Sequence, residues 1–133
     1  GGQSVTDVRD IARGFALLLE KGNAGENYLM IGGNYTYHTI VSTLAESLNI
    51  APPEKVFPMW IGSFIVPLVS IMEKIALNSP RLTKEMAVGG FQYRYYKSDK
   101  AAHELGWTAE YSLEETCRDT VDYYNNHTSR VNQ

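Results

Sequence analysis

Two overlapping runs of the sequence place a lysine four residues after a tyrosine. They are Tyr96 to Lys100 and Tyr93 to Lys97. On one helix this spacing brings the two side chains together, so that the lysine lowers the pKa of a tyrosine acting as an acid and base. Ser98 is a typical helix N-cap residue, so we expect Tyr96 to lie before the helix and Lys100 inside it. We therefore interpret neither pair as catalytic.

Other sequence patterns that carry chemistry are missing. No Gly-x-Gly-x-x-Gly or Gly-x-x-Gly-x-x-Gly run occurs, and Gly22 to Gly25 follows a predicted helix where a dinucleotide cradle would follow a strand. His38, His103 and His127 are far apart and lack a second ligand type at zinc-like spacing. No Gly-x-Ser-x-Gly elbow is present. The sequence thus predicts no catalytic, cofactor-binding or metal-ligating residue within this chain.

Composition restricts the class of protein. The chain has 133 residues, 44% hydrophobic and 20% charged, which is typical of one soluble domain. Its net charge of -3 argues against a nucleic-acid partner. The single cysteine, Cys117, excludes an internal disulfide and fits a reducing compartment. No signal peptide is visible, so we expect a cytoplasmic location.

The first half of the sequence predicts an alternation of strands and helices. Ser4 to Val8 is β-prone, and Asp10 is the expected N-cap of a helix that ends at Gly22. Asn27 to Ile31 is apolar without alternation, which is typical of a strand buried on both faces. Thr36 then caps a helix that Pro52 and Pro53 must end.

The second half is expected to be mainly helical. Lys55 to Pro58 is a third short strand candidate, and Met59 to Leu77 is a hydrophobic helix interrupted at Pro67. Its uncharged part is shorter than the ~20 apolar residues that cross a bilayer, so we expect no membrane span. Ser79 and Pro80 begin a helix over Arg81 to Val88, which Gly89 and Gly90 end. A capping box over Ser112 to Glu115 opens the last helix, followed by a polar tail from Asn125 to His127 onward.

These elements make an α/β unit with very little sheet, and residues 1–133 form a single domain. The apolar strand at Asn27 to Ile31 needs neighbours on both edges, and the chain supplies few. Two explanations remain open: the partner strands belong to a missing segment, or copies of the chain complete one another as a homo-oligomer.

The stretch from Tyr95 to Trp107 reads Tyr-Tyr-Lys-Ser-Asp-Lys-Ala-x-x-Glu-Leu-Gly-Trp, with a predicted helix between Ser98 and Gly106. It resembles the substrate-domain signature of extended short-chain dehydrogenases/reductases, in the branch of dihydroflavonol-4-reductase-like and sugar-epimerase-like proteins. The resemblance extends from about Val5 to Tyr124. Within it, Asp10 matches a family aspartate, whereas Asp7 stands where the family usually has histidine.

The resemblance implies a mainly helical C-terminal part of an NAD(P)-binding Rossmann-type enzyme, with two or three short strands. The parent would be an NAD(P)-dependent oxidoreductase or epimerase acting on a small molecule related to flavonoids, steroids or sugars. Its NAD or NADP site and its catalytic tyrosine and lysine would lie upstream of Gly1. We therefore expect this chain alone to bind no cofactor and to be inactive.

In the resembled family this part of the protein shapes the substrate pocket. Large amphipathic side chains on connecting segments suit such a pocket, and equally suit packing against the missing half. The candidate substrate-binding residues are Met59, Trp60, Met86, Phe91, Tyr93 and Tyr95. The rival hypothesis from another class is a stand-alone interaction module that associates with itself or another protein and catalyses nothing.

Overall fold

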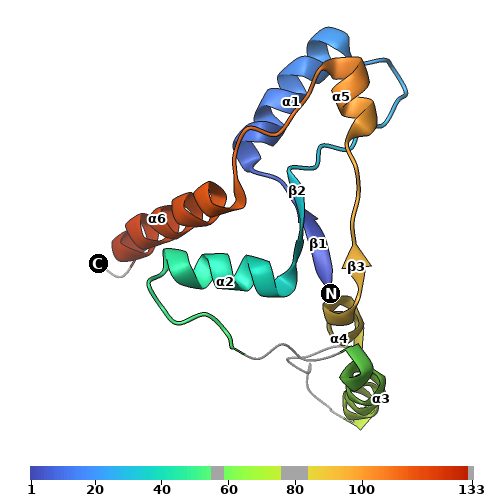
Figure 1. Cartoon of the computed structure of the whole chain (residues 1–133), viewed down its shortest axis with the longest axis vertical. Coiled ribbons are helices and arrows are strands. Elements are labelled where there is room, and N and C mark those ends of the chain that lie inside the picture. The colour runs from blue at the N-terminus through green and yellow to red at the C-terminus, as the bar shows by residue number, and fades with distance from the viewer. Residues whose placement is uncertain (55–58, 76–83, 132–133) are drawn as a thin grey trace.

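The computed structural model describes residues 1–54, 59–75 and 84–131, and the chain is an α/β unit in which helices predominate (Figure 1). Its elements in chain order are β1 (Gly2–Val5), α1 (Val8–Lys21), β2 (Gly33–Thr36), α2 (Tyr37–Ser47), α3 (Met59–Ile75), α4 (Lys84–Phe91), β3 (Tyr93–Arg94), α5 (Asp99–Leu105) and α6 (Leu113–Val131). The predicted α/β class with a few short strands is confirmed. The predicted strand at Lys55 to Pro58 and the helix start at Ser79 and Pro80 fall outside the described residues.

The three strands form one small mixed sheet in the order β2-β1-β3. β1 and β2 are antiparallel, with Gly2 opposite Thr36 and Val5 opposite Gly33. β1 and β3 are parallel, with Gly2 opposite Tyr93. Because β1 lies between β2 and β3, it pairs both with the strand that follows α1 and with the strand that follows α4.

Two strand predictions need correction. The first strand is Gly2–Val5 rather than Ser4 to Val8, because Val8 already begins α1. The predicted buried strand at Asn27 to Ile31 is wrong: those residues are not a strand, and Leu29 is 52% exposed. The second strand is Gly33–Thr36 instead, and no strand among the described residues pairs with residues 27–31.

The N-cap of α1 is Asp7, and the prediction of Asp10 is wrong. An Asp7 carboxylate oxygen accepts a hydrogen bond of 2.8 Å from the backbone N–H of Arg9. Asp10 lies one turn further on, where it is fully buried and binds a different segment. Gly22 ends the helix as predicted.

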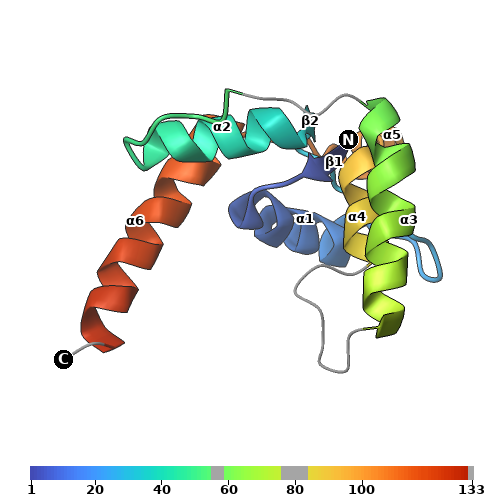
Figure 2. The same cartoon turned by 90° about the horizontal axis from the view of Figure 1, so that it is seen from below.

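The caps of α2 and α6 follow the sequence closely. Thr36 Oγ1 accepts from the N–H of Thr39 at 3.0 Å, and α2 ends before the two prolines. Ser112 and Glu115 form the expected reciprocal capping box, at 2.9 and 3.2 Å. The side chains of α2 and α6 pack together, and α6 then projects away from the rest of the chain (Figure 2).

Two predicted helix ends are wrong. α6 continues through Asn125 to His127 and ends at Val131. The ring of His127 stacks on the ring of Tyr123, with 3.9 Å between centroids, and forms a hydrogen bond with the Tyr123 backbone carbonyl. These contacts within one turn support the helix there. α4 passes through Gly89 and Gly90 and ends at Phe91. α3 runs to Ile75 with Pro67 inside it. Among the described residues, no helix has the length and apolar content that crossing a bilayer requires.

The main buried cluster joins α1, α5 and the segment after α5. Trp107, Leu105 and Ala101 are almost fully buried, and Leu17, Leu18, Tyr28, Met30 and Ala109 pack around them. Gly106 ends α5 as predicted, and its backbone lies in the left-handed region at φ 70°. This turn directs Trp107 back under α1, where its side chain is almost fully buried.

Candidate functional site

A hollow of about 500 Å³ lies beside the short strand β3. Its lining residues come from α2, α4 and β3 and are Tyr37, Glu85, Gly89, Gly90 and Arg94. Gly89 and Gly90 leave the hollow wide, because a side chain at Gly90 would meet no other atom within 4 Å. The hollow is open to solvent on one side, so a ligand entering it would need a second wall.

The polar groups of this hollow can bind oxygen-bearing ligands. The Arg94 guanidinium has no hydrogen bond or ion pair with any residue in the described ranges, and it lies near the last turn of α4 at Gly89. It offers N–H donors, the Tyr37 hydroxyl both donates and accepts, and the Glu85 carboxylate accepts. Such a set suits carbonyl and hydroxyl groups on an apolar ligand.

The predicted substrate-binding residues Tyr93 and Tyr95 lie on the other side of β3 from Arg94. Their rings form an edge-to-face pair with centroids 5.4 Å apart, and both side chains are largely exposed. The Tyr95 ring and hydroxyl lie directly over Gly2, where a Cβ would come within 2.5 Å of the hydroxyl. Tyr95 therefore covers the central strand of the sheet at Gly2.

The remaining predicted site residues lie on α3 and α4. Trp60 forms an edge-to-face pair with Phe64, 6.2 Å between centroids, and both are exposed. The Phe91 ring packs on Gly62, so it joins α4 to α3. Met59 begins α3 and Met86 belongs to α4, and their side chains lie outside what the structure describes.

The four predicted residues whose side chains the structure describes, Trp60, Phe91, Tyr93 and Tyr95, are not among the lining residues of this hollow. Sequence reasoning missed Tyr37, Glu85 and Arg94, and it interpreted Gly89 and Gly90 only as a helix end. Successive side chains of a strand point to opposite faces. This alternation along Tyr93, Arg94 and Tyr95 is the signal that would have placed Arg94 on the opposite face from the two tyrosines.

A second hollow, of about 580 Å³, lies between the start of α1 and α6. Its lining residues are Thr6, Asp7, Val8, Arg9, Thr116, Asp119, Thr120 and Tyr123. Arg9 bridges Asp7 and Asp119 at 2.8 and 2.7 Å and stacks on Tyr111 at 3.7 Å from the ring centroid. The hydrogen bonds from Arg9 hold the pKa of the Asp7 carboxyl well below its usual range. Because these charges are paired with one another, we assign them to stability.

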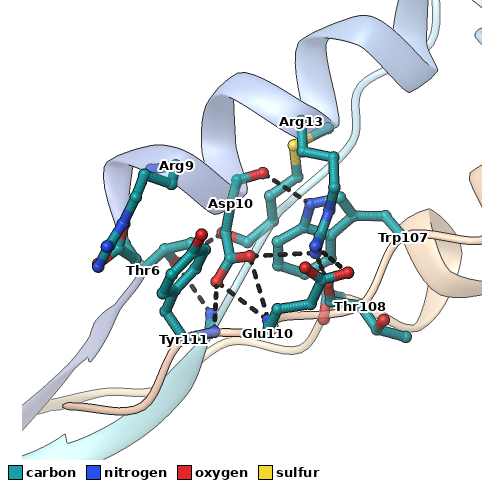
Figure 3. A network of polar contacts seen from close by, with 12 residues as sticks. Thr6, Arg9, Asp10, Arg13, Trp107, Thr108, Glu110 and Tyr111 are labelled. Atoms are coloured by element: carbon teal, nitrogen blue, oxygen red, sulfur yellow. Dashed lines mark hydrogen bonds and ion pairs between the residues drawn. The ribbon is translucent and has the colours of Figure 1, made fainter. Parts of the chain in front are cut away.

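Asp10 is the centre of a buried polar network that connects α1 to the segment before α6 (Figure 3). Its carboxylate accepts hydrogen bonds from the backbone N–H groups of Glu110 and Tyr111, at 3.1 to 3.2 Å. It also forms an ion pair with Arg13 at 3.0 Å. Arg13 also donates to the Thr108 carbonyl. The Asp10 carboxylate is fully enclosed by these donors, so its role is structural.

The tyrosine–lysine pairs are separated as expected. Tyr96 precedes α5, whereas Lys100 lies inside it and forms a 2.5 Å ion pair with Glu26. Hydrogen bonding to Glu26 raises the pKa of Lys100 above its usual value. Ser98 is the N-cap residue by position, but its hydroxyl donates to the Ile31 carbonyl and caps no helix N–H.

The described residues give little support for a metal site or for a reactive thiol. In residues 1–54, 59–75 and 84–131, no three histidine, cysteine or acidic side chains are grouped as a metal site. Cys117 on α6 is buried, and burial raises the pKa of its thiol.

Comparison with known proteins shows the fold. No family model and no curated protein matches the chain. A solved structure described as the crystal structure of gox2253 matches 95% of this chain, with a TM-score of 0.74 and 24% sequence identity. The match covers 38% of gox2253, so this chain spans well under half the length of that protein. The two proteins share a fold over this region.

Proposed function

We propose that this chain is the substrate-binding portion of an NAD(P)-dependent oxidoreductase or epimerase that resembles dihydroflavonol-4-reductase. In this proposal the residues described here form one wall of the substrate site. The NAD or NADP site and the catalytic groups belong to a separate dinucleotide-binding segment, and the chain alone is inactive and cytoplasmic.

The observation that carries the proposal is the one-sided hollow beside β3. It combines the N–H donors of Arg94, which have no partner in the described part of the chain, and the hydroxyl of Tyr37 with two glycines that keep it open. Polar groups at the edge of an apolar and aromatic surface are typical of small-molecule sites, and a site open on one side suits closure by another domain.

The match to gox2253 adds support of a different kind. The same fold occurs there as 38% of a longer chain, which is the arrangement that a substrate-binding portion requires. The separation of Tyr96 from Lys100 also agrees with a catalytic pair located elsewhere.

The test is an NMR titration of the isolated chain with dihydroquercetin, a dihydroflavonol, and separately with NADPH. We expect dihydroquercetin to shift resonances of Tyr37, Glu85 and Arg94, which line the hollow, at millimolar concentration, and NADPH to shift none. Arg94→Ala should weaken the dihydroquercetin shifts, while Arg118→Ala, on the exposed side of α6, should not. Saturable NADPH binding to the isolated chain would reject the proposal.

The rival function is self-association without catalysis. It is favoured by one observation: β2 and β3 are edge strands of a very small sheet, and edges of this kind pair readily between chains. Light scattering separates the two proposals, because a stable dimer that ignores dihydroquercetin supports the module and a monomer supports the substrate-binding portion.

A further inference from the structure

Helix α3 carries a stripe of large apolar side chains that the described chain leaves exposed. Its members recur every three or four residues and are Trp60, Phe64, Leu68 and Ile71. This spacing places them on one side of the helix. They are 66%, 69%, 59% and 56% exposed, in that order. These four side chains form the α3 stripe.

The opposite side of α3 is already packed. Gly62 and Val69 lie on that side and are buried, and the Phe91 ring of α4 packs on Gly62. In both views α3 lies at the edge of the molecule, with α4 between it and β1 (Figure 1, Figure 2). The α3 stripe therefore faces away from the rest of the described chain.

The stripe is free of charge and begins with a tryptophan. Residues 59–72 contain no acidic or basic side chain. The Trp60 ring forms an edge-to-face pair with Phe64, and its indole N–H has no hydrogen bond with any described residue. Tryptophan is enriched at membrane–water interfaces, because its ring enters the apolar region while its N–H meets polar groups. The α3 stripe has this composition.

The exposed proline in α3 indicates a wet environment. Pro67 lies on the same side as the stripe and has no N–H to donate to the Ser63 carbonyl one turn earlier. A carbonyl without its helix partner needs water or another donor. The headgroup region of a bilayer supplies water, whereas the hydrocarbon core does not. A helix of this kind suits the plane of the interface.

The size of the stripe decides between a second copy of the chain and a lipid surface. An aromatic side chain offers 150–250 Å² when fully exposed, so the four side chains together offer roughly 500 Å². A stable protein interface buries about 800 Å² on each partner, so the stripe alone is too small for a dimer. A bilayer sets no such minimum, because apolar side chains enter it without matching a fixed shape.

We propose that the α3 stripe attaches this protein to the surface of a lipid bilayer, with α3 in the plane of the interface and Trp60 among the headgroups. Because the stripe is uncharged and the chain has a net charge of -3, we expect no gain from anionic lipid. The proposal goes beyond the proposed function and does not depend on which reaction the parent catalyses.

The test is flotation with vesicles of phosphatidylcholine. It uses the 133-residue chain and the product of the complete reading frame that encodes it. We expect both proteins to float with the vesicles, and added phosphatidylglycerol to leave the bound fraction unchanged. Failure of the complete product to bind overturns the proposal, also when the 133-residue chain binds, because the stripe is then covered by protein. Binding that requires phosphatidylglycerol overturns it as well.

A matched pair of variants tests the stripe itself. Leu68→Glu places a charge in the stripe and should lower vesicle partitioning at least ~10-fold. Ile50→Glu is the control, because Ile50 has the same exposure of 59% but follows α2. It should stay within about twofold of the unchanged protein, since it alters no residue of α3. If circular dichroism shows that Leu68→Glu is unfolded, Phe64→Glu provides the same test. Unchanged partitioning of the folded stripe variant contradicts the proposal.

The two tryptophans separate attachment from unfolding on the vesicle. Trp60 is 66% exposed and Trp107 only 1%. In the 133-residue chain, vesicles should shift the tryptophan emission to shorter wavelength, and Trp60→Phe should remove this shift but retain binding. A shift that persists in Trp60→Phe comes from Trp107 and overturns the proposal. So does a lipid-free dimer that Leu68→Glu dissociates, seen by light scattering, if neither protein binds vesicles.

Discussion

The indole nitrogen of Trp107 donates a hydrogen bond of 3.0 Å to the backbone carbonyl of Asp10, across 97 residues of sequence. The Asp10 carboxylate meanwhile accepts from the N–H groups of Glu110 and Tyr111. One residue of α1 thus fixes both the turn after α5 and the approach to α6.

Asp10→Ala should destabilise the chain by about 3 kcal/mol, because it removes the ion pair with Arg13 and leaves two partly buried N–H donors without their acceptor. Urea unfolding followed by circular dichroism measures the change. Asp122→Ala on the exposed side of α6 is the control and should change stability by less than about 0.5 kcal/mol. Similar values for both variants would show that the network contributes nothing specific.

Asp7 should make stability depend on pH in the acid range. Because Arg9 lowers the pKa of Asp7 in the folded chain, this stabilisation is complete above the ordinary carboxyl value of ~4. It is lost as the pH falls from there toward the lowered pKa. Asp7→Asn should therefore reduce stability at pH 7 and flatten its decline below about pH 4. Parallel pH curves for the two proteins would contradict this assignment.

Gly106→Ala should cost about 1 kcal/mol, because φ is 70° there and an added Cβ disfavours that backbone conformation. No atom lies closer than 4.0 Å to the position of that Cβ, so the cost comes from the backbone alone. Gly90→Ala is the matched control. It adds a Cβ into open space within α4 and should be neutral or stabilising in thermal unfolding.

Tyr96→Phe and Lys100→Ala should leave NADPH-dependent turnover of the complete reading-frame product within about twofold of the unchanged protein. Tyr96 lies outside α5, and Lys100 is engaged by Glu26. A catalytic acid/base contributes ~100-fold or more, so steady-state rates distinguish the two cases clearly. A hundredfold loss in Tyr96→Phe would make this tyrosine catalytic and contradict our interpretation.

Local signals in the sequence predicted the features that depend only on neighbouring residues. Thr36, Ser112 and Gly22 act at helix ends where the sequence predicts them, because a cap needs only its own turn. Gly106 likewise ends α5 where the sequence predicts the end of that helix. The α/β class followed from these elements.

Features that depend on distant contacts were not predictable in this way. Asp10 was interpreted as a cap because nothing local reveals that Glu110 and Tyr111 donate to it. Residues 27–31 have the composition of a strand, but strand formation needs a neighbour that the described chain does not place there. The hollow at Arg94 depends on how α2 and α4 meet β3, and no short pattern encodes that meeting.

The central claim is that this chain supplies a substrate wall and that another segment supplies the cofactor and the catalytic groups. The most direct measurement is oxidation of NADPH, with dihydroquercetin as substrate, by the 133-residue chain and by the product of its complete reading frame. The account predicts no turnover by the chain alone and measurable turnover by the complete product. Turnover by the chain alone, or none by the complete product with any dihydroflavonol, steroid or sugar-nucleotide substrate, would contradict it.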